Sequence, residues 1–392
     1  MIEMFGNSAC VGCSACANIC PQNCITMQSD EEGFCYPVAD PGRCIACGRC
    51  VTVCPVQKEP LTATCAIQAY GAVSKKESQR MASSSGGIFS LLAENILDRG
   101  GVVFGAAFSD DFKSVNHMAV ENREELVKLR GSKYLQSRIG NAYVQAKQYL
   151  DQGRAVLFTG TPCQIGGLRA FLGRDYDQLH TQSVVCHGVP SPKVWENYVV
   201  FQEQKAGALL SGISFRVKKP DWQNYSLEFA FGYQKSYSCR ASEDMFMRCF
   251  LKDLMLRPSC YACQFKGIQD PSDLSLADFW GIQHVLPELN DGKGTSLVLV
   301  RTEKGRKLLE SIAADMKLRP VDYTQAVAGN AAAVYSVKKP QLRSRFMKDI
   351  QNKPVHEVLI RYSRDTVVRK TASRLRWYRV KLQRICLKYW KK

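Results

Sequence analysis

Residues 10–21 read Cys-Val-Gly-Cys-Ser-Ala-Cys-Ala-Asn-Ile-Cys-Pro, and residues 44–55 repeat the pattern as Cys-Ile-Ala-Cys-Gly-Arg-Cys-Val-Thr-Val-Cys-Pro. Both stretches have the spacing C-x2-C-x2-C-x3-C-P. Three thiolates that are two residues apart can wrap around one corner of a four-iron cubane from a tight loop. The fourth thiolate, next to the proline, turns away and reaches a second cubane. The two stretches therefore predict an N-terminal domain that holds two iron–sulfur clusters.

The crossing of the fourth cysteine sets the ligand assignment. One cluster takes Cys10, Cys13, Cys16 and Cys54, and the other takes Cys44, Cys47, Cys50 and Cys20. This spacing is the signature of the two-cluster ferredoxins. Zinc is the alternative, but zinc ribbons use separated C-x2-C pairs rather than four close cysteines before a proline. Three more cysteines are predicted to be small buried apolar residues: Cys24, Cys35 and Cys65.

Length and composition set the broad class of the protein. The chain has 392 residues, 45% of them hydrophobic, so two or three globular domains are expected and a disordered or fibrous protein is excluded. We find no basic segment followed by an apolar run at the N-terminus, and no run of about 18 apolar residues anywhere. A cytoplasmic protein is therefore expected. In such a chain, 18 cysteines favour metal binding over disulfides.

The body of the chain alternates between helical and strand periods. A β-α-β-α unit covers strand 155–160, helix 162–172, strand 181–186 and helix 192–204, which implies a local parallel sheet. Further helices and strands are predicted at 88–97, 102–108, 115–120, 124–129, 139–150, 212–217, 227–231, 237–239 and 297–300. The expected fold class is α+β, with a two-cluster ferredoxin domain followed by a mixed α/β domain.

Two cysteines of this unit suggest a third cluster. Residues 161–162, Thr-Pro, suit a helix cap, so Cys163 lies in the first turn, where amides and the helix dipole favour a thiolate. Cys186 ends the next strand, so both cysteines lie at the carboxyl edge of the sheet, where ligands usually bind. Cys260 and Cys263 would complete a set of four thiols. On spacing alone, inert core cysteines beside an incidental pair remain the alternative.

Five further stretches carry a family resemblance. They read Ser83-Ser-Ser-Gly-Gly87, Arg130-Gly-Ser-Lys-Tyr134, Gly160-Thr-Pro-Cys-Gln164, Cys186-His-Gly-Val-Pro-Ser-Pro192 and Asp278-Phe-Trp-Gly281. With the ferredoxin motifs, they resemble the coenzyme F420 hydrogenase/dehydrogenase beta-subunit family as far as about Arg301. The resemblance implies a core that binds FAD and its own four-iron cluster. It therefore favours a third cluster on Cys163, Cys186, Cys260 and Cys263.

The resemblance also implies flavin contacts. The residues that open a helix could admit a pyrophosphate through bare amides and small side chains: Ser84, Ser85, Gly86 and Gly87.

Five other residues are candidates for the flavin and the reaction. Lys133 could neutralise a phosphate or the N1 region of the reduced flavin, with Tyr134 packed on a ring. Thr161 and Gln164 belong to the stretches that bind cofactor in the family. His187 is the catalytic candidate, as a proton donor to substrate or flavin, and a hydrogen bond to the cluster is its alternative role.

The combined prediction is an iron–sulfur flavoprotein oxidoreductase. It would pass electrons between a reduced carrier, either ferredoxin-like or F420-like, and an organic substrate, through three [4Fe-4S] clusters and FAD. Two alternatives are a non-catalytic electron-transfer subunit of a larger complex and a redox-linked membrane adaptor. No feature of the sequence identifies F420 or the substrate.

The predicted domains are 1–60, the ferredoxin domain; 61–330, the flavin- and cluster-binding catalytic domain; 331–360, a helical extension; and 361–392, a basic tail. The net charge is +17, and residues 361–392 carry twelve basic side chains against one acidic one. The tail has apolar residues at helical spacing, namely Leu375, Tyr378, Leu382, Ile385 and Tyr389, together with Trp377 and Trp390. A basic amphipathic helix on an anionic membrane surface is one interpretation. Docking on an acidic partner and a solvated tail are the others, and no nucleic-acid-binding module is present.

Overall fold

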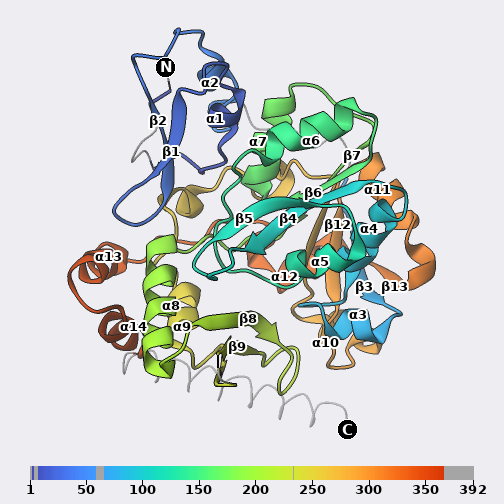
Figure 1. Cartoon of the computed structure of the whole chain (residues 1–392). Coiled ribbons are helices and arrows are strands. Elements are labelled where there is room, and N and C mark those ends of the chain that lie inside the picture. The colour runs from blue at the N-terminus through green and yellow to red at the C-terminus, as the bar shows by residue number, and fades with distance from the viewer. Residues whose placement is uncertain (1, 4–7, 59–65, 233, 366–392) are drawn as a thin grey trace.

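The computed structural model describes residues 2–3, 8–58, 66–232 and 234–365 (Figure 1). Most of the predicted basic tail, residues 366–392, lies outside these residues, as do Cys65 and Cys386. The interpretations of the tail therefore stay predictions. In the described ranges, no helix is long and apolar enough to cross a bilayer.

The N-terminal segment has two cysteine loops around one small hairpin. Its elements are α1 (Ala15–Ile19), β1 (Ile25–Ser29), β2 (Cys35–Ala39) and α2 (Arg49–Thr52), with β1 antiparallel to β2. Each loop enters its short helix through a left-handed residue, Ser14 at φ 61° and Gly48 at φ 72°. The two sequence repeats thus fold alike. In Figure 1 the hairpin points toward the body, and α2 lies at the outer end.

The body is built on an eight-stranded mixed sheet of order β13-β3-β12-β11-β7-β6-β4-β5. Strands β4, β6, β7 and β11 are parallel neighbours, and the flanking strands pair antiparallel. The strands are β3 (Gln68–Ser74), β4 (Val102–Phe108), β5 (Val115–Val120), β6 (Val156–Gly160), β7 (Leu179–Val184), β11 (Leu274–Asp278), β12 (Ser296–Val300) and β13 (Met316–Val321).

Helices cover this sheet and a second, three-stranded one of order β10-β9-β8 (Figure 1). The second sheet is β8 (Leu210–Val217), β9 (Ser226–Phe231) and β10 (Ser236–Arg240). The helices are α3 (Glu77–Met81), α4 (Ile88–Leu97), α5 (Arg123–Leu129), α6 (Ala142–Asp151), α7 (Pro162–Leu172), α8 (Pro192–Ala206), α9 (Met245–Leu251), α10 (Ile282–Val285), α11 (Glu303–Glu310), α12 (Tyr323–Ala328), α13 (Arg343–Asn352) and α14 (Val355–Ser363).

The N-terminal segment and the body share one buried core. Cysteines of both motifs belong to the same apolar cluster as Phe104, Tyr143 and Phe158 of the body. Arg257 joins the two parts: its Nε donates to the carbonyl of Cys10 at 2.8 Å, and its guanidinium lies 4.4 Å from the ring of Tyr36. The iron–sulfur segment is therefore packed against the body.

The predicted fold class is confirmed, because an iron–sulfur segment precedes a mixed α/β body. The main difference in the β-α-β-α unit concerns the strand predicted at 181–186, which is β7 at Leu179–Val184. The last bond of its parallel ladder runs from the amide of Val185 to Leu276. Cys186 therefore lies in the loop after the strand, where the chain is free to turn toward a ligand.

Candidate functional site

Two cavities in the N-terminal segment are each lined by four predicted ligands. The first thiol set, Cys10, Cys13, Cys16 and Cys54, lines one cavity. The second thiol set, Cys20, Cys44, Cys47 and Cys50, lines the other. In each cavity the fourth cysteine comes from the opposite motif, as the spacing predicts. Across the described part of the chain, no three His, Cys, Asp or Glu side chains are arranged to hold a single metal ion.

Cys24 also lines the second cavity, although the sequence predicts only a small buried residue there. Its Sγ lies 3.4 Å from the Sγ of Cys20. The hydrogen bond with Cys20 is the main cause that raises the pKa of Cys24 to about 11. Cys24 therefore keeps its proton and can donate it to Cys20, which supports Cys20 as the thiolate that a cluster needs.

A third thiol set gathers beyond the carboxyl ends of the parallel strands. Cys163 lies in the first turn of α7, and Cys186 follows β7. Cys260 lies in the short helix η1 (Pro258–Ala262), and Cys263 comes directly after it. Burial first, and then Cys263, Cys186 and Cys260, raise the pKa of Cys163 well above its usual value. Four thiols from separate parts of the sequence are thus close enough to interact, as one more cluster requires.

Thr161 and Gln164 fix the start of α7. The backbone N–H of Thr161 donates to Oε1 of Gln164 at 3.0 Å, and Nε2 of Gln164 donates to the carbonyl and hydroxyl of Ser137, both at 3.0 Å. The hydroxyl of Thr161 lies 3.1 Å from Sγ of Cys163. The buried amide of Gln164 is therefore engaged within the protein. Both residues are placed to orient Cys163, and their contact with a flavin stays a prediction.

Helix α7 also connects the first and third thiol sets. A Cβ placed on Gly167 would lie 3.1 Å from Sγ of Cys13 and 2.7 Å from the hydroxyl of Tyr143. Tyr143 is fully buried and donates to the carbonyl of Gln164 at 2.8 Å. Its pKa is raised well above the usual value by burial first, and then by Cys13, Cys163 and Cys16. The two thiol sets therefore lie on either side of one tyrosine and one helical turn.

We expect Gly167→Ala to weaken the first thiol set. The added methyl must displace Cys13 or Tyr143, and overpacking of this kind costs about 1–3 kcal/mol. Gly42→Ala is the control, because its Cβ would meet only the side chain of Asp40 at 3.4 Å. On exposure to air, the Gly167 variant should lose its iron–sulfur absorbance several-fold faster than the wild type. Equal rates for both variants and the wild type would show that the packing of Gly167 against Cys13 and Tyr143 can accommodate a methyl group.

The loop at residues 84–87 packs against the eight-stranded sheet, although its sequence suggests a loop open to a phosphate. The amide of Gly86 donates to the hydroxyl of Ser296 at 3.0 Å, and a Cβ there would lie 2.4 Å from the carbonyl of Ala72. Gly86 is therefore needed for packing against β3 and β12, and its amide is already bonded. Ser84 accepts from Ser132, and Ser85 donates to the carbonyl of Thr295. Gly87, at φ 88°, leads into α4 and leaves the first amides of that helix as the pyrophosphate candidates.

Lys133 and Tyr134 follow the end of α5. Nζ of Lys133 donates to the carbonyls of Leu129, Arg130 and Gly131 at 2.9–3.3 Å, and burial lowers its pKa to about 7. Lys133 thus changes charge near neutral pH, which suits a residue beside a redox-active ring. The ring of Tyr134 packs between Phe215 and Phe250, at centroid distances of 5.3 Å.

Arg216 is a functional candidate that the sequence analysis missed. Its guanidinium lies 3.9 Å from the ring of Tyr225 and 5.5 Å from that of Trp280, and it pairs with Asp278 at 2.7 Å. Nε and Nη2 of this buried side chain have no hydrogen-bond partner within the protein. Buried guanidinium donors normally find partners, so these two are available to a ligand. The motif Asp278-Phe-Trp-Gly281 thereby gains a role, which is to hold Arg216.

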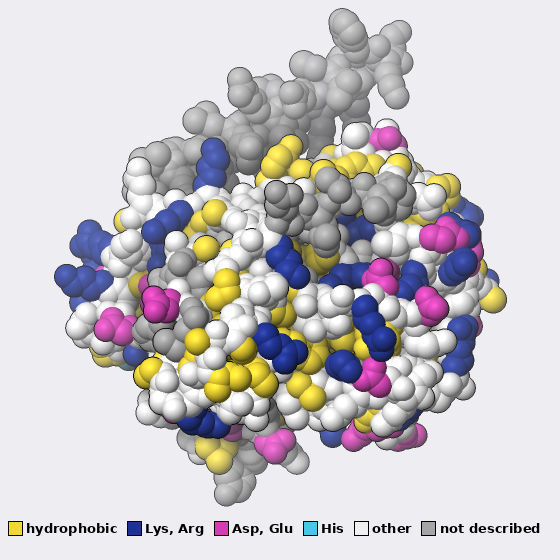
Figure 2. All heavy atoms as spheres, turned by 90° about the horizontal axis from the view of Figure 1, so that it is seen from above, with side chains coloured by type: hydrophobic (Ala, Val, Ile, Leu, Met, Phe, Trp, Pro, Cys, Tyr) yellow, Lys and Arg dark blue, Asp and Glu magenta, His cyan; other side chains and the backbone are white. Residues whose placement is uncertain are grey.

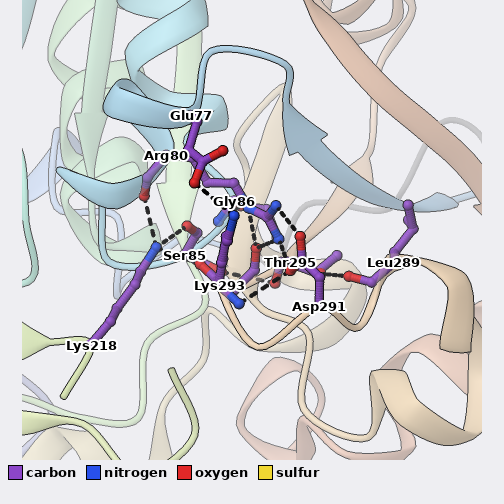
Figure 3. Close-up of polar contacts among 11 residues, drawn as sticks. Glu77, Arg80, Ser85, Gly86, Lys218, Leu289, Asp291, Lys293 and Thr295 are labelled. Carbon is purple, nitrogen blue, oxygen red and sulfur yellow. Dashed lines mark hydrogen bonds and ion pairs between the residues drawn. The ribbon is translucent and has the colours of Figure 1, made fainter. Parts of the chain in front are cut away.

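A basic group surrounds the loop at 84–87 (Figure 3). Nζ of Lys218 donates to the carbonyls of Arg80, Ser85 and Lys293 at 2.7–2.8 Å, and burial is the main cause that lowers its pKa to about 8. Arg80 pairs with Asp291 at 2.6 Å. In Figure 3, Lys218 reaches toward Ser85 from one side and Lys293 lies close by. Lys293 pairs with Glu77 at 2.6 Å, so carboxylates offset two of these three cations. The positive charge that favours an anionic ligand beside the loop therefore comes mainly from Lys218.

His187 follows Cys186 and lies against α9. Its Nε2 lies 2.6 Å from Oδ1 of Asp253, and its ring packs edge-on against Phe250 at 5.3 Å. Asp253 accepts a hydrogen bond from Nε2 and so fixes the orientation of the imidazole. The backbone on the other side of the histidine is held by Lys266, whose Nζ donates to the carbonyl of Cys186.

Comparison with known families accounts for these features. The description "Coenzyme F420 hydrogenase/dehydrogenase, beta subunit" applies to two family models, an N-terminal one that matches residues 69–142 and a C-terminal one that matches 153–325. The chain belongs to this family. A 4Fe-4S dicluster domain matches residues 9–58, so this beta-subunit-like chain carries its own ferredoxin segment.

The solved structures include one chain of the F420-reducing [NiFe] hydrogenase complex from Methanosarcina barkeri, in a xenon derivative. It is 17% identical, with a TM-score of 0.47, and the match covers 76% of this chain and 91% of that chain. No curated protein matches the sequence. The family and the dicluster domain make this chain an iron–sulfur electron-transfer protein of the hydrogenase/dehydrogenase beta-subunit type.

Proposed function

We propose that this chain is an iron–sulfur flavoprotein oxidoreductase that exchanges electrons between a carrier and an organic substrate. The observation that carries the proposal is the gathering of the third thiol set, one helical turn from Cys13 of the first set. The three sets would hold three [4Fe-4S] clusters. Their arrangement leads from the outer end of the N-terminal segment into the body.

The residues around Arg216 fit FAD, as judged by its two unpartnered donors and the basic group beside the loop at 84–87. FAD would supply a centre that takes electrons singly and passes on two as a hydride equivalent. Arg216 would bind an anionic or carbonyl oxygen of the flavin, and the first turn of α4 would bind the pyrophosphate. Lys133 holds or releases a proton near pH 7.

His187 is proposed as a proton carrier at Nε2, oriented by Asp253. Its neighbour Cys186 belongs to the third thiol set, so the imidazole could instead support that set through the backbone. The two roles differ in the effect of His187→Gln. Loss of a proton carrier should lower turnover with iron retained, whereas loss of support for the third thiol set should lower the iron content.

A second candidate function is an electron-conducting subunit whose catalysis occurs on another chain. The family description itself favours it, since its members are named as beta subunits.

The anaerobic absorbance spectrum, followed by denaturation and flavin analysis, tests the proposal. We expect one FAD per chain on top of the broad iron–sulfur absorbance. Protein that carries full iron but releases no flavin, even after incubation with FAD, would refute the flavoprotein proposal and leave the electron-conducting subunit.

A further inference from the structure

The second thiol set lies at the exposed outer end of the molecule. Among the described cysteines, Cys47 alone is exposed. Two large apolar side chains beside it also face solvent: Ile45 is 61% exposed and Val51 is 38% exposed. Figure 1 shows α2 at this outer end, away from the eight-stranded sheet. Because electron tunnelling weakens steeply with distance, an exposed ligand loop is where an external carrier would exchange electrons.

Charge around this loop is opposite in sign to that of the rest of the segment. Residues 1–60 contain three basic side chains, Arg43, Arg49 and Lys58, and all three are exposed between residues 43 and 58. The only acidic residue from 40 to 58 is Asp40. Figure 2, which views the molecule from above, shows Lys and Arg side chains interspersed with hydrophobic and acidic ones.

The acidic side chains of the hairpin turn face the body instead. Glu32 forms a bidentate pair with Arg343 of α13, at 2.5 and 3.0 Å. Glu31 accepts from Gln351 of the same helix at 3.2 Å. Two acidic residues of the segment are therefore engaged with the body, while the loop from residue 43 to 58 carries exposed basic side chains.

We propose that the surface formed by Arg43, Ile45, Cys47, Arg49 and Val51 is the docking site of a small acidic electron-carrier protein. The proposal rests on the proposed function, because it names the class of partner that supplies or takes the electrons. The carrier gives up one electron, and the chain is reduced by one. An apolar centre with a basic rim suits a short-lived complex. The opposite charges speed up association, and the small contact area allows rapid dissociation.

The test uses the full chain and the hydroquinone of flavodoxin, a small acidic carrier whose blue semiquinone reports each electron transferred. Arg43→Glu should lower the second-order rate constant at least three-fold at low salt, and Arg43→Glu/Arg49→Glu at least ten-fold. Arg319→Glu is the matched control, because Arg319 is also exposed and, like Arg43, donates to one backbone carbonyl. The wild-type rate should fall with salt until it meets that of the variants, since screening acts over about 10 Å at 0.1 M.

Reduced methyl viologen, a small cation, separates docking from cluster integrity. Arg43→Glu should contain the same iron as the wild type and react with this cation at least as fast, because the substitution removes a positive charge that repels it. If flavodoxin reduces wild type, Arg43→Glu and Arg319→Glu equally fast, the docking surface is refuted. If flavodoxin does not reduce the wild type but viologen does, the acidic carrier is refuted while the redox function stands. Failure of both reductants would instead refute the proposed function.

Discussion

Replacing Cys163 with Ser is expected to remove about four irons from a total of about twelve, because three four-iron clusters would each use four thiols. The same loss is expected for Cys186→Ser. The ferredoxin clusters should remain, since the first and second thiol sets line cavities of their own. Iron and sulfide analysis after anaerobic reconstitution measures the loss, and the electron paramagnetic resonance of the reduced protein identifies the clusters that stay.

Cys249→Ser is the control for this result. Cys249 is buried, whereas the cysteines of the third thiol set are partly buried, and its Sγ donates to the carbonyl of Leu359 at 3.6 Å. This variant should keep all twelve irons. A count near eight in the unmodified protein, or a Cys163 variant with undiminished iron, would contradict the third cluster.

Replacing Arg216 with Leu is expected to weaken flavin binding strongly while iron is retained. Hydrogen bonds from a charged donor are worth about 1.5–3 kcal/mol each, so the loss of two weakens binding by roughly a hundred-fold or more. The measurement is the ratio of FAD to protein after anaerobic purification, followed by titration with FAD.

Arg216→Lys separates the binding role from the structural one. Lysine keeps a charge near Asp278 but has no planar fork, so we expect an intermediate affinity with normal iron and normal circular dichroism. Gly86→Leu would not serve for this purpose, because its side chain would collide with β3 whether or not a flavin binds there. Full flavin content in Arg216→Leu would show that the flavin lies elsewhere.

Sequence reasoning predicted well wherever the signal is local. The helix at 88–97 and the strand at 102–108 coincide with α4 and β4, because their apolar periods are uninterrupted. The start of α7 was predictable from Thr-Pro at 161–162, because an N-cap threonine followed by proline is a local helix-start signal. By contrast, the strand predicted at 181–186 is displaced, because polar residues of β7 such as Gln182 are buried by partners from distant segments.

The spacing of the cysteines by itself determined the iron–sulfur chemistry of this protein, because three thiolates two residues apart can reach one cubane from a single loop and the matching motif supplies the fourth. Tertiary structure alone decided which residues surround the cluster sites and the proposed flavin site. Arg216 and Trp280 meet across 64 positions of sequence, and Arg257 reaches Cys10 across 247 positions. Such contacts depend on which strands pair and which side chains are buried together, and no local pattern encodes them. For the same reason Gly86 resembles a phosphate loop in sequence, yet in the fold it packs against two strands.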